Sequence, residues 1–183
     1  MIRPMIIGMR SWYPTEKTQC KSQIESFINT DIITEKESVI GCIVPHAGWY
    51  YSGEIAVNTI RILKEKNPDC SNIVIFGGHT YADENITLEN FDAAQTPFGS
   101  IENDPVLLNF ISKNLNPKVI SYRPDNTIEI LLPIIHYFFN NIKITTLYMP
   151  PNIDRIEGGI KIFKNSPENT IFVASTDLTH YGP

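Results

Sequence analysis

Histidine side chains carry the clearest chemical potential in this sequence of 183 residues. Three of its four histidines, His46, His79 and His180, come shortly after apolar runs of the kind that form buried strands. A neutral imidazole is a common transition-metal ligand, so His46 and His79 could share one ion. Asp177 stands just before His180 and adds a carboxylate beside a group that can transfer protons. The pattern indicates a site for metal binding and proton transfer.

Other residues near these histidines leave more than one interpretation open. Trp49 and Tyr51 follow His46 and could line a pocket, or they could pack where a helix begins. His136 lies in a helical run of apolar residues, which is typical of a histidine hydrogen-bonded in a core face. Ser175 lacks the surrounding GxSxG pattern of a nucleophile elbow, so the sequence does not predict a serine hydrolase.

The segments that carry these residues alternate between strand-like and helix-like patterns. Dense runs of β-branched residues predict buried strands over 38–44, 72–76, 143–149 and 170–174. Apolar residues at helical spacing predict helices over 16–29, 52–66, 105–114, 128–140 and 153–164. We expect Thr15 to cap the first of these helices, and Pro133 to lie at a kink or near a helix start.

Strands separated by helices favour an α/β fold with a mainly parallel sheet covered on both faces. Ligands of open α/β sheets bind in the crevice beyond the carboxyl ends of the strands. Because three histidines follow predicted strands, we expect their imidazoles to meet at that edge of the sheet.

Composition narrows the class of protein. The length fits a single domain, and the net charge of −5 without any cluster of Lys or Arg argues against a nucleic-acid binder. No apolar run reaches the roughly 20 residues of a membrane span, and the start of the chain makes a poor signal peptide. Three widely spaced cysteines predict neither a disulfide framework nor a metal clip. We therefore expect a soluble, cytoplasmic domain that binds neither nucleic acid nor membrane.

Four segments resemble the motifs of one protein family. Segment 11–14, SWYP, is similar to the GSWYP motif, and 44–53, VPHAGWYYSG, is similar to PHAGYxYSG. Segment 77–80, GGHT, resembles a GPSH or GPNH turn, and 175–182, STDLTHYG, resembles SSDLSHYG. In this order and over the whole chain, the segments resemble the MEMO family, also called protein B of the AmmeMemoRadiSam system.

The resemblance implies a three-layer α/β/α sandwich similar to the class III extradiol ring-cleaving dioxygenases, which use non-haem Fe(II). It implies that His46 and His79 are two of three metal ligands. His180 would be the acid/base group, with Asp177 beside it. The family's third ligand is commonly a cysteine, which makes the site softer and suits copper as well as iron. That ligand lies beyond the last motif, so we expect 1–183 to be a single MEMO-like domain that is incomplete at its C-terminus.

Segment 125–133 is similar to the family's EHSxExxLP motif, with two consequences for substrate binding. Asn126 replaces the motif's histidine, whereas Glu129 is retained. Asparagine can hydrogen-bond a ligand but cannot titrate near neutral pH, which weakens a proton relay. With Trp49 and Tyr51, these two residues are the substrate-binding residues that we expect.

Three functions are compatible with these residues. The first is a metal-dependent, dioxygenase-like oxidoreductase that uses iron or copper. The second is a non-catalytic module that binds a small molecule or a peptide in the same cleft. The third is a zinc hydrolase in which Asp177 or Glu129 completes the ligand set and His180 activates water. By family association, radical SAM and AMMECR1-type proteins are the expected partners.

Overall fold

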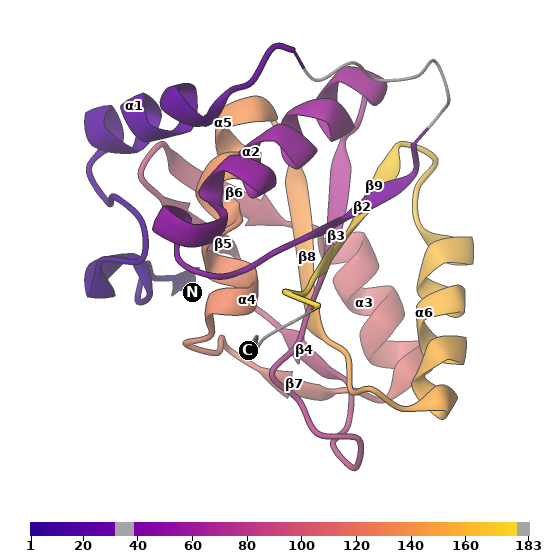
Figure 1. The fold of residues 1–183 in the computed structure, drawn as a ribbon. Helices are drawn as coiled ribbons and strands as arrows, with labels where there is room; N and C mark the ends of the chain where they lie inside the picture. The colour runs from indigo at the N-terminus through magenta and orange to yellow at the C-terminus, as the bar shows by residue number, and fades with distance from the viewer. Residues whose placement is uncertain (32–38, 179–183) are drawn as a thin grey trace.

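One large sheet with helices on both faces forms the framework of the protein (Figure 1). A computed structural model describes residues 1–31 and 39–178. The strands in those ranges are β1 (Ile2–Arg3), β2 (Gly41–Val44), β3 (Asn72–Gly77), β4 (Thr87–Glu89), β5 (Ala93–Thr96), β6 (Gly99–Asn103), β7 (Lys118–Ile120), β8 (Lys143–Tyr148) and β9 (Thr170–Ser175). The helices there are η1 (Gly8–Arg10), α1 (Lys17–Phe27), α2 (Trp49–Lys66), α3 (Pro105–Leu115), α4 (Asn126–Glu129), α5 (Leu132–Phe138) and α6 (Ile153–Asn165).

The order of strands brings three distant segments together at one end of the sheet. Among the described residues the order is β1-β5-β6-β8-β3-β9-β2, with β4 pairing with β7 and β8 off this path. The pairings are parallel except those of β5 with β6 and of β4 with β8. The expectation of a mainly parallel α/β sheet is therefore confirmed. Since β9 lies between β3 and β2, the carboxyl ends of these three parallel strands stand side by side.

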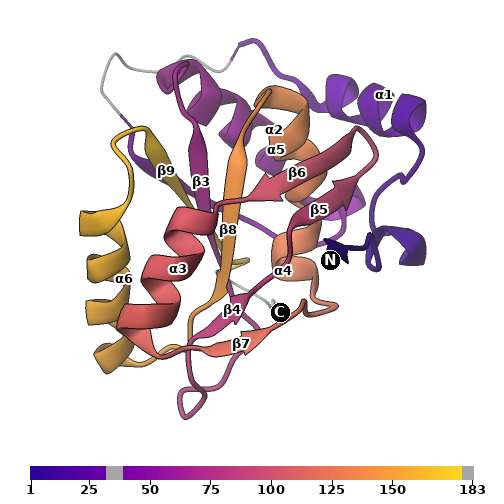
Figure 2. The ribbon, with the colours of Figure 1, turned by 180° about the vertical axis from the view of Figure 1, so that it is seen from behind.

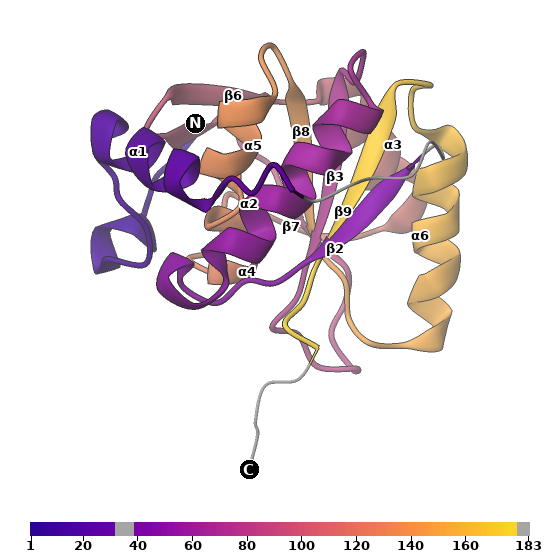
Figure 3. The same ribbon diagram turned by 45° about the horizontal axis from the view of Figure 1, so that its top comes forward.

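Strand β3 shows why the molecule has three layers. Its side chains alternate: Ile73 and Ile75 join the core formed with α1, α2 and α5, whereas Val74 and Phe76 join the core formed with α3 and α6. Figure 2 shows α3 and α6 in front of the sheet, and Figure 3 shows α1, α2 and α5 on the opposite face. This arrangement confirms the three-layer α/β/α sandwich.

The expected cap of the first helix was wrong by one residue. Glu16, not Thr15, precedes α1, and its carboxylate accepts hydrogen bonds from the backbone N–H groups of Thr18 and Gln19. These two hydrogen bonds lower the pKa of Glu16. A longer acidic side chain can therefore satisfy the free N–H groups of a first turn as a threonine would.

The run expected to form one helix over 128–140 forms two short helices, α4 and α5. Pro133 lies in the first turn of α5, as expected of a residue without a backbone N–H. The break leaves α4 as a separate short turn, and the residues at its start face the carboxyl ends of the strands.

The strand predictions missed β1 and the strands from β4 to β7. These strands are two to five residues long, and β7 has no buried side chain. Such short segments carry too few apolar residues for a pattern, and pairing with neighbours defines them instead. Among the helices of the described part, none has the length and apolar character needed to cross a bilayer. That 1–183 is one domain stays a prediction.

Candidate functional site

The carboxyl ends of β2, β3 and β9 each lead into one candidate residue. His46, His79 and Asp177 each stand two residues beyond their strand. Because Val44 pairs with Ser175, the ends of β2 and β9 are level with each other. The ring centroids of His46 and His79 lie 5.2 Å apart, with the ring planes at 82°. The parallel sheet thus brings together two imidazoles that are far apart in the sequence.

His46 is buried and is held on both sides by polar groups from the end of β9. Its backbone N–H donates to Asp177 Oδ1 at 2.6 Å, and its ring Nε2 lies 3.7 Å from Asp177 Oδ2. Its Nδ1 lies 2.9 Å from the Ser175 hydroxyl, which donates to the carbonyl of Thr127. The ring therefore has a defined orientation and a carboxylate beside it.

His79 lies at the more open side of the pair, with 47% of its side chain exposed. Its Nδ1 is 3.3 Å from Asp125 Oδ2, and Arg123 donates to its carbonyl oxygen at 2.8 Å. Arg123 Nε also lies 3.7 Å from Asp125 Oδ2. A ligand from solvent can thus approach the pair from the side of His79.

The first turn of α4 supports both histidines. Asp125 caps this helix, and its Oδ1 accepts from the backbone N–H and the hydroxyl of Thr127. Asn126 donates to the carbonyl oxygen of His46 at 2.9 Å. Gly77 lies so close to Thr127 that a Cβ at position 77 would come within 2.6 Å of its hydroxyl oxygen, so only glycine fits without a shift.

Sequence reasoning did not identify Asp125, Thr127 or Ser175 as parts of the site. Each belongs to a segment that resembles a family motif, in which the neighbouring residues Asn126 and Asp177 were the predicted ones. The signal that could have found Asp125 was its position as an N-cap before a short apolar run. Hydrogen bonding to the histidine rings has no signature in a single sequence.

Comparison with known proteins agrees with the motif resemblance. Residues 4–183 match the protein family described as Memo-like protein. This chain belongs to the Memo-like family. Its relatives include a MEMO1 family protein of Methanococcoides burtonii, which is 30% identical over all of this chain and 69% of its own length. Another, from Methanosarcina barkeri, is 29% identical over all of this chain and 69% of its own length.

Glu129, at the end of α4, belongs to a second polar group. We call this group the Arg3 cluster, and its members are Arg3, Tyr13, Glu89, Glu129 and Tyr148. Arg3 Nη1 lies 3.1 Å from Glu129, and its Nε lies 3.3 Å from Glu89. Tyr13 and two backbone N–H groups also donate to Glu129. The carboxylate of Glu129 is buried and faces these donors. That Glu129 binds substrate stays a prediction.

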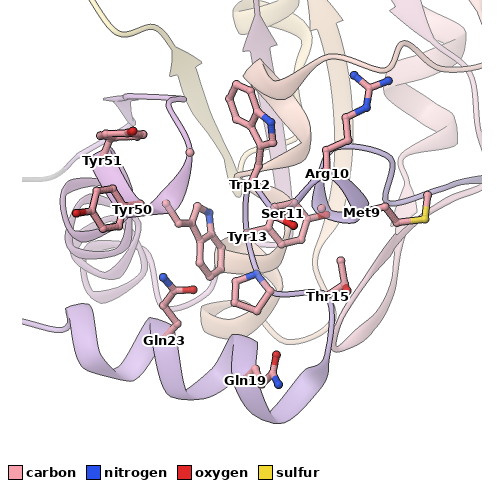
Figure 4. Close-up of a pocket in the computed structure, with 14 residues that line it drawn as sticks. Met9, Arg10, Ser11, Trp12, Tyr13, Thr15, Gln19, Gln23, Tyr50 and Tyr51 are labelled. Atoms are coloured by element: carbon pink, nitrogen blue, oxygen red, sulfur yellow. The ribbon is translucent and has the colours of Figure 1, made fainter.

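The two aromatic residues of the PHAGYxYSG-like segment occupy different environments. Trp49 is buried, and its indole N–H donates to the carbonyl of Ile130 at 3.0 Å. Tyr51 is 81% exposed. Both line a cavity of about 600 Å³ between η1, the start of α1 and the start of α2, beside Trp12 and Tyr13 (Figure 4). Neither His46 nor His79 lines this cavity, although the loop after β2 contributes to both places.

Of the remaining two histidines, His136 and His180, the structure describes only His136. His180, the expected acid/base group of the Memo-like motif, lies outside the described residues. His136 is half-buried, with its Nδ1 2.6 Å from the Thr96 hydroxyl. Burial, with Lys17 nearby, lowers the pKa of His136. The interpretation of His136 as a partly buried, hydrogen-bonded histidine is confirmed.

Potential metal donors are sparse in the described part of the chain. Within residues 1–31 and 39–178, no group of three or more His, Cys, Asp or Glu side chains is placed to hold an ion. Burial raises the pKa of the Cys20 and Cys42 thiols to about 12, which keeps them protonated near neutral pH. The described residues thus offer an imidazole pair with Asp177 beside it. That this pair holds iron or copper stays a prediction.

Proposed function

We propose that this Memo-like protein binds a transition-metal ion, iron or copper, with His46 and His79 and uses it in redox chemistry on a small molecule. The observation that carries the proposal is the 5.2 Å separation of the two ring centroids at the carboxyl edge of the sheet. A bound iron or copper ion would supply a reversible change of oxidation state. The chain's own residues would hold the ion and orient a substrate beside it.

Two carboxylates favour a cation at this place. Asp177 lies 3.7 Å from Nε2 of His46, and Asp125 lies 3.3 Å from Nδ1 of His79. Asp125 behind the His79 imidazole would orient that ring and make it a stronger ligand, and Asp177 adds a negative charge on the Nε2 side of His46. The exposed side of His79 provides the approach for an ion and for a small molecule.

Metal binding by protein without a His-tag tests the proposal. Fe(II) under anaerobic conditions and Cu(II) are each titrated into the wild type, His46→Ala, His79→Ala and His136→Ala. We expect the first two variants to lose at least about tenfold in affinity, since outer-shell losses alone cost that much. His136→Ala is the matched control, because that imidazole bonds Thr96 away from the pair, and it should bind as the wild type does.

Two results would overturn this proposal. One is a wild-type protein that retains no iron or copper and takes up neither. The other is a double variant, His46→Ala with His79→Ala, that binds metal as tightly as the wild type. Uptake of zinc, together with ester hydrolysis that depends on Asp177, would support the zinc hydrolase instead. The position of Asp177 beside His46 favours that alternative.

The cavity favours a second candidate function, binding of an aromatic small molecule or peptide without catalysis. Trp12, Trp49 and Tyr51 line about 600 Å³, a volume typical of ligand sites. Quenching of tryptophan fluorescence by a panel of aromatic ligands would measure such binding. Tyr51→Ala should weaken it, whereas Tyr81→Ala, an equally exposed tyrosine outside the cavity lining, should not.

A further inference from the structure

We propose that α6 is the contact surface of a dimer, in which it packs against α6 of a second copy of this chain. The feature behind this is an exposed apolar stripe along one side of the helix. Its members are each between 46% and 77% exposed: Ile153, Ile156, Ile160 and Phe163. At about 100° per residue, these side chains fall within about 80° of one another around the helix axis. The stripe therefore faces solvent as one surface.

The stripe is additional to the face by which α6 packs on the sheet. Gly158 and Ile162 are buried on that other face, where Ile162 joins the same core as Leu147. A surface helix needs one apolar face for the core, and its remaining side is usually polar. Since α6 lies at the outer margin of the molecule (Figures 1 and 2), its second apolar side is open to another protein. Contiguous exposed apolar surface of this kind marks an interaction site.

The apolar surface continues from α6 to β2, the last strand in the order of the described sheet. The Phe163 ring lies against Phe172 of β9, with the ring centroids 5.2 Å apart. On β2, Cys42 and Val44 contact the core on the opposite face, so Ile43 between them points to the side of α6. Ile43 is exposed. A partner that packs on α6 can therefore also cover this side of β2.

The spacing of the stripe fits a second copy that runs in the opposite direction. In an antiparallel helix pair related by a two-fold axis, residues face each other when their numbers add up to one constant sum. The numbers of Ile153 and Phe163 add up to the same sum as those of Ile156 and Ile160. A single arrangement thus matches every member of the stripe with a member of its copy.

A hollow beside the stripe adds to this fit. It measures about 360 Å³ and lies where α6 begins, and Met149 and Pro150 line it together with Ile153. In the antiparallel pair the partner's Phe163 stands opposite Ile153, so that its half-exposed ring can enter this hollow. The stripe thus provides both a projecting aromatic ring and a recess for one. Such self-complementarity is what an isologous two-fold interface requires.

Charges beside the stripe favour the same arrangement. Glu157 and Lys161 are both exposed and stand one turn apart on the polar side of the stripe. In the antiparallel pair, Glu157 of one copy comes next to the partner's Lys161, and the symmetry repeats this contact. A different protein whose surface carries charges of one sign would meet a like charge at one of these two positions, which is unfavourable. The charge pattern therefore favours a second copy as the occupant.

Sedimentation equilibrium of the full chain between about 5 and 200 μM tests the proposal. We expect a dimer with a dissociation constant of about 10–100 μM, because one helix pair makes an interface at the small end of the specific ones. Ile160→Glu should weaken the dimer at least about tenfold, since each copy would then bury an unpaired carboxylate. Ile55→Glu is the matched control, because it changes an exposed isoleucine of α2 on the opposite face, and it should leave dimerisation unchanged.

Exchange of the two charges gives the second measurement. Glu157→Lys and Lys161→Glu should each weaken the dimer about two- to fivefold, and the double variant should return the dissociation constant close to that of the wild type. If Ile160→Glu fails to fold, these surface variants still decide the inference. A double variant that dimerises no more tightly than the single variants would overturn the antiparallel pairing.

Two further results would overturn the inference. One is a wild type that remains monomeric at about 200 μM, in which case the stripe belongs to the binding site of a different protein. The other is a dimer that Ile55→Glu weakens as much as Ile160→Glu does, which would place the interface elsewhere on the molecule.

Discussion

The short helix α4 joins two polar clusters that differ in what they leave exposed. At its first turn, Asp125 and Thr127 support His46 and His79, and 47% of the His79 side chain faces solvent. At its last residue, Glu129 enters the Arg3 cluster, where Arg3 and both glutamates are no more than 1% exposed. One turn of helix thus connects an open cluster with a closed one.

The difference separates the proposed site from a cluster whose polar groups are fully paired within the chain. In the Arg3 cluster each oxygen of Glu89 and Glu129 accepts a hydrogen bond from the chain itself. Buried charges need such complete pairing, since each unpaired one costs several kcal/mol. The histidine pair has its Nδ1 atoms bonded within the chain; the His46 ring is buried, whereas 47% of the His79 side chain is exposed. This partial exposure of His79 distinguishes the proposed site from the Arg3 cluster.

The largest effect is expected for Arg3→Met. This change leaves the carboxylates of Glu89 and Glu129 buried without the guanidinium between them. Breaking a buried ion pair in this way lowers the free energy of unfolding by about 3–5 kcal/mol. Urea unfolding followed by tryptophan fluorescence measures it.

For the more open histidine pair, the corresponding variant is His79→Ala, and its expected effect on stability is small. Because the His79 side chain is half exposed, its removal should change the free energy of unfolding by less than about 1 kcal/mol. Equal destabilisation by the two variants would mean that the histidine pair is as much a structural element as the Arg3 cluster.

An intermediate effect is expected at alkaline pH. Burial, together with Glu129, raises the pKa of Tyr13, and burial, together with Glu89, raises that of Tyr148. The unfolded chain ionises both phenols near pH 10, whereas the folded protein keeps them protonated. The stability that they contribute is therefore fully present below about pH 10 and is lost as the pH rises. Each tyrosine should lower the free energy of unfolding by about 1.4 kcal/mol per pH unit above that point.

Urea unfolding between about pH 8 and pH 11 measures this slope. Tyr13→Phe removes one of the two phenols and should make the slope clearly shallower. Tyr50→Phe, at an exposed tyrosine outside the Arg3 cluster, is the matched control and should leave it unchanged. A Tyr13→Phe variant with the wild-type slope would contradict the contribution of Tyr13 to the alkaline loss, to which the buried Cys20 and Cys42 thiols also contribute.

A small effect is also expected for Asn126→Ala, next to the histidine pair. It removes one hydrogen bond, 2.9 Å long, to the carbonyl of His46 and should cost about 0.5–1.5 kcal/mol of stability. The ring of His46 keeps its bond to Ser175, so Co(II) affinity should stay within a few-fold of wild type. A loss as large as that of His46→Ala would show that the backbone carbonyl of His46, rather than its ring, controls the site.

The apolar pattern was sufficient to predict the elements that build the core. Runs such as 72–76 and 170–174 correspond to β3 and β9, and helical spacing identified α3 and α6 to within one residue at each end. Three strand ends were enough to select His46 and His79, because parallel strands bring the residues at their carboxyl ends to one edge of the sheet. The short strands escaped prediction, since their pairing depends on neighbours that lie elsewhere in the chain.

Local pattern and motif therefore determined the α/β architecture, the family and the choice of the two histidines. Tertiary structure decided which groups surround each side chain. Glu129 belongs to a segment that resembles a family motif, yet it pairs with Arg3. Arg3 lies in β1, the first strand in the sheet order, and stands more than a hundred residues earlier in the chain. Thr127 attracts no notice as a residue type, yet it forms hydrogen bonds with Ser175 and Asp125, which lie beside the two rings. Hydrogen bonds act over about 3 Å and depend on which segments the fold brings within that distance, which one sequence does not record.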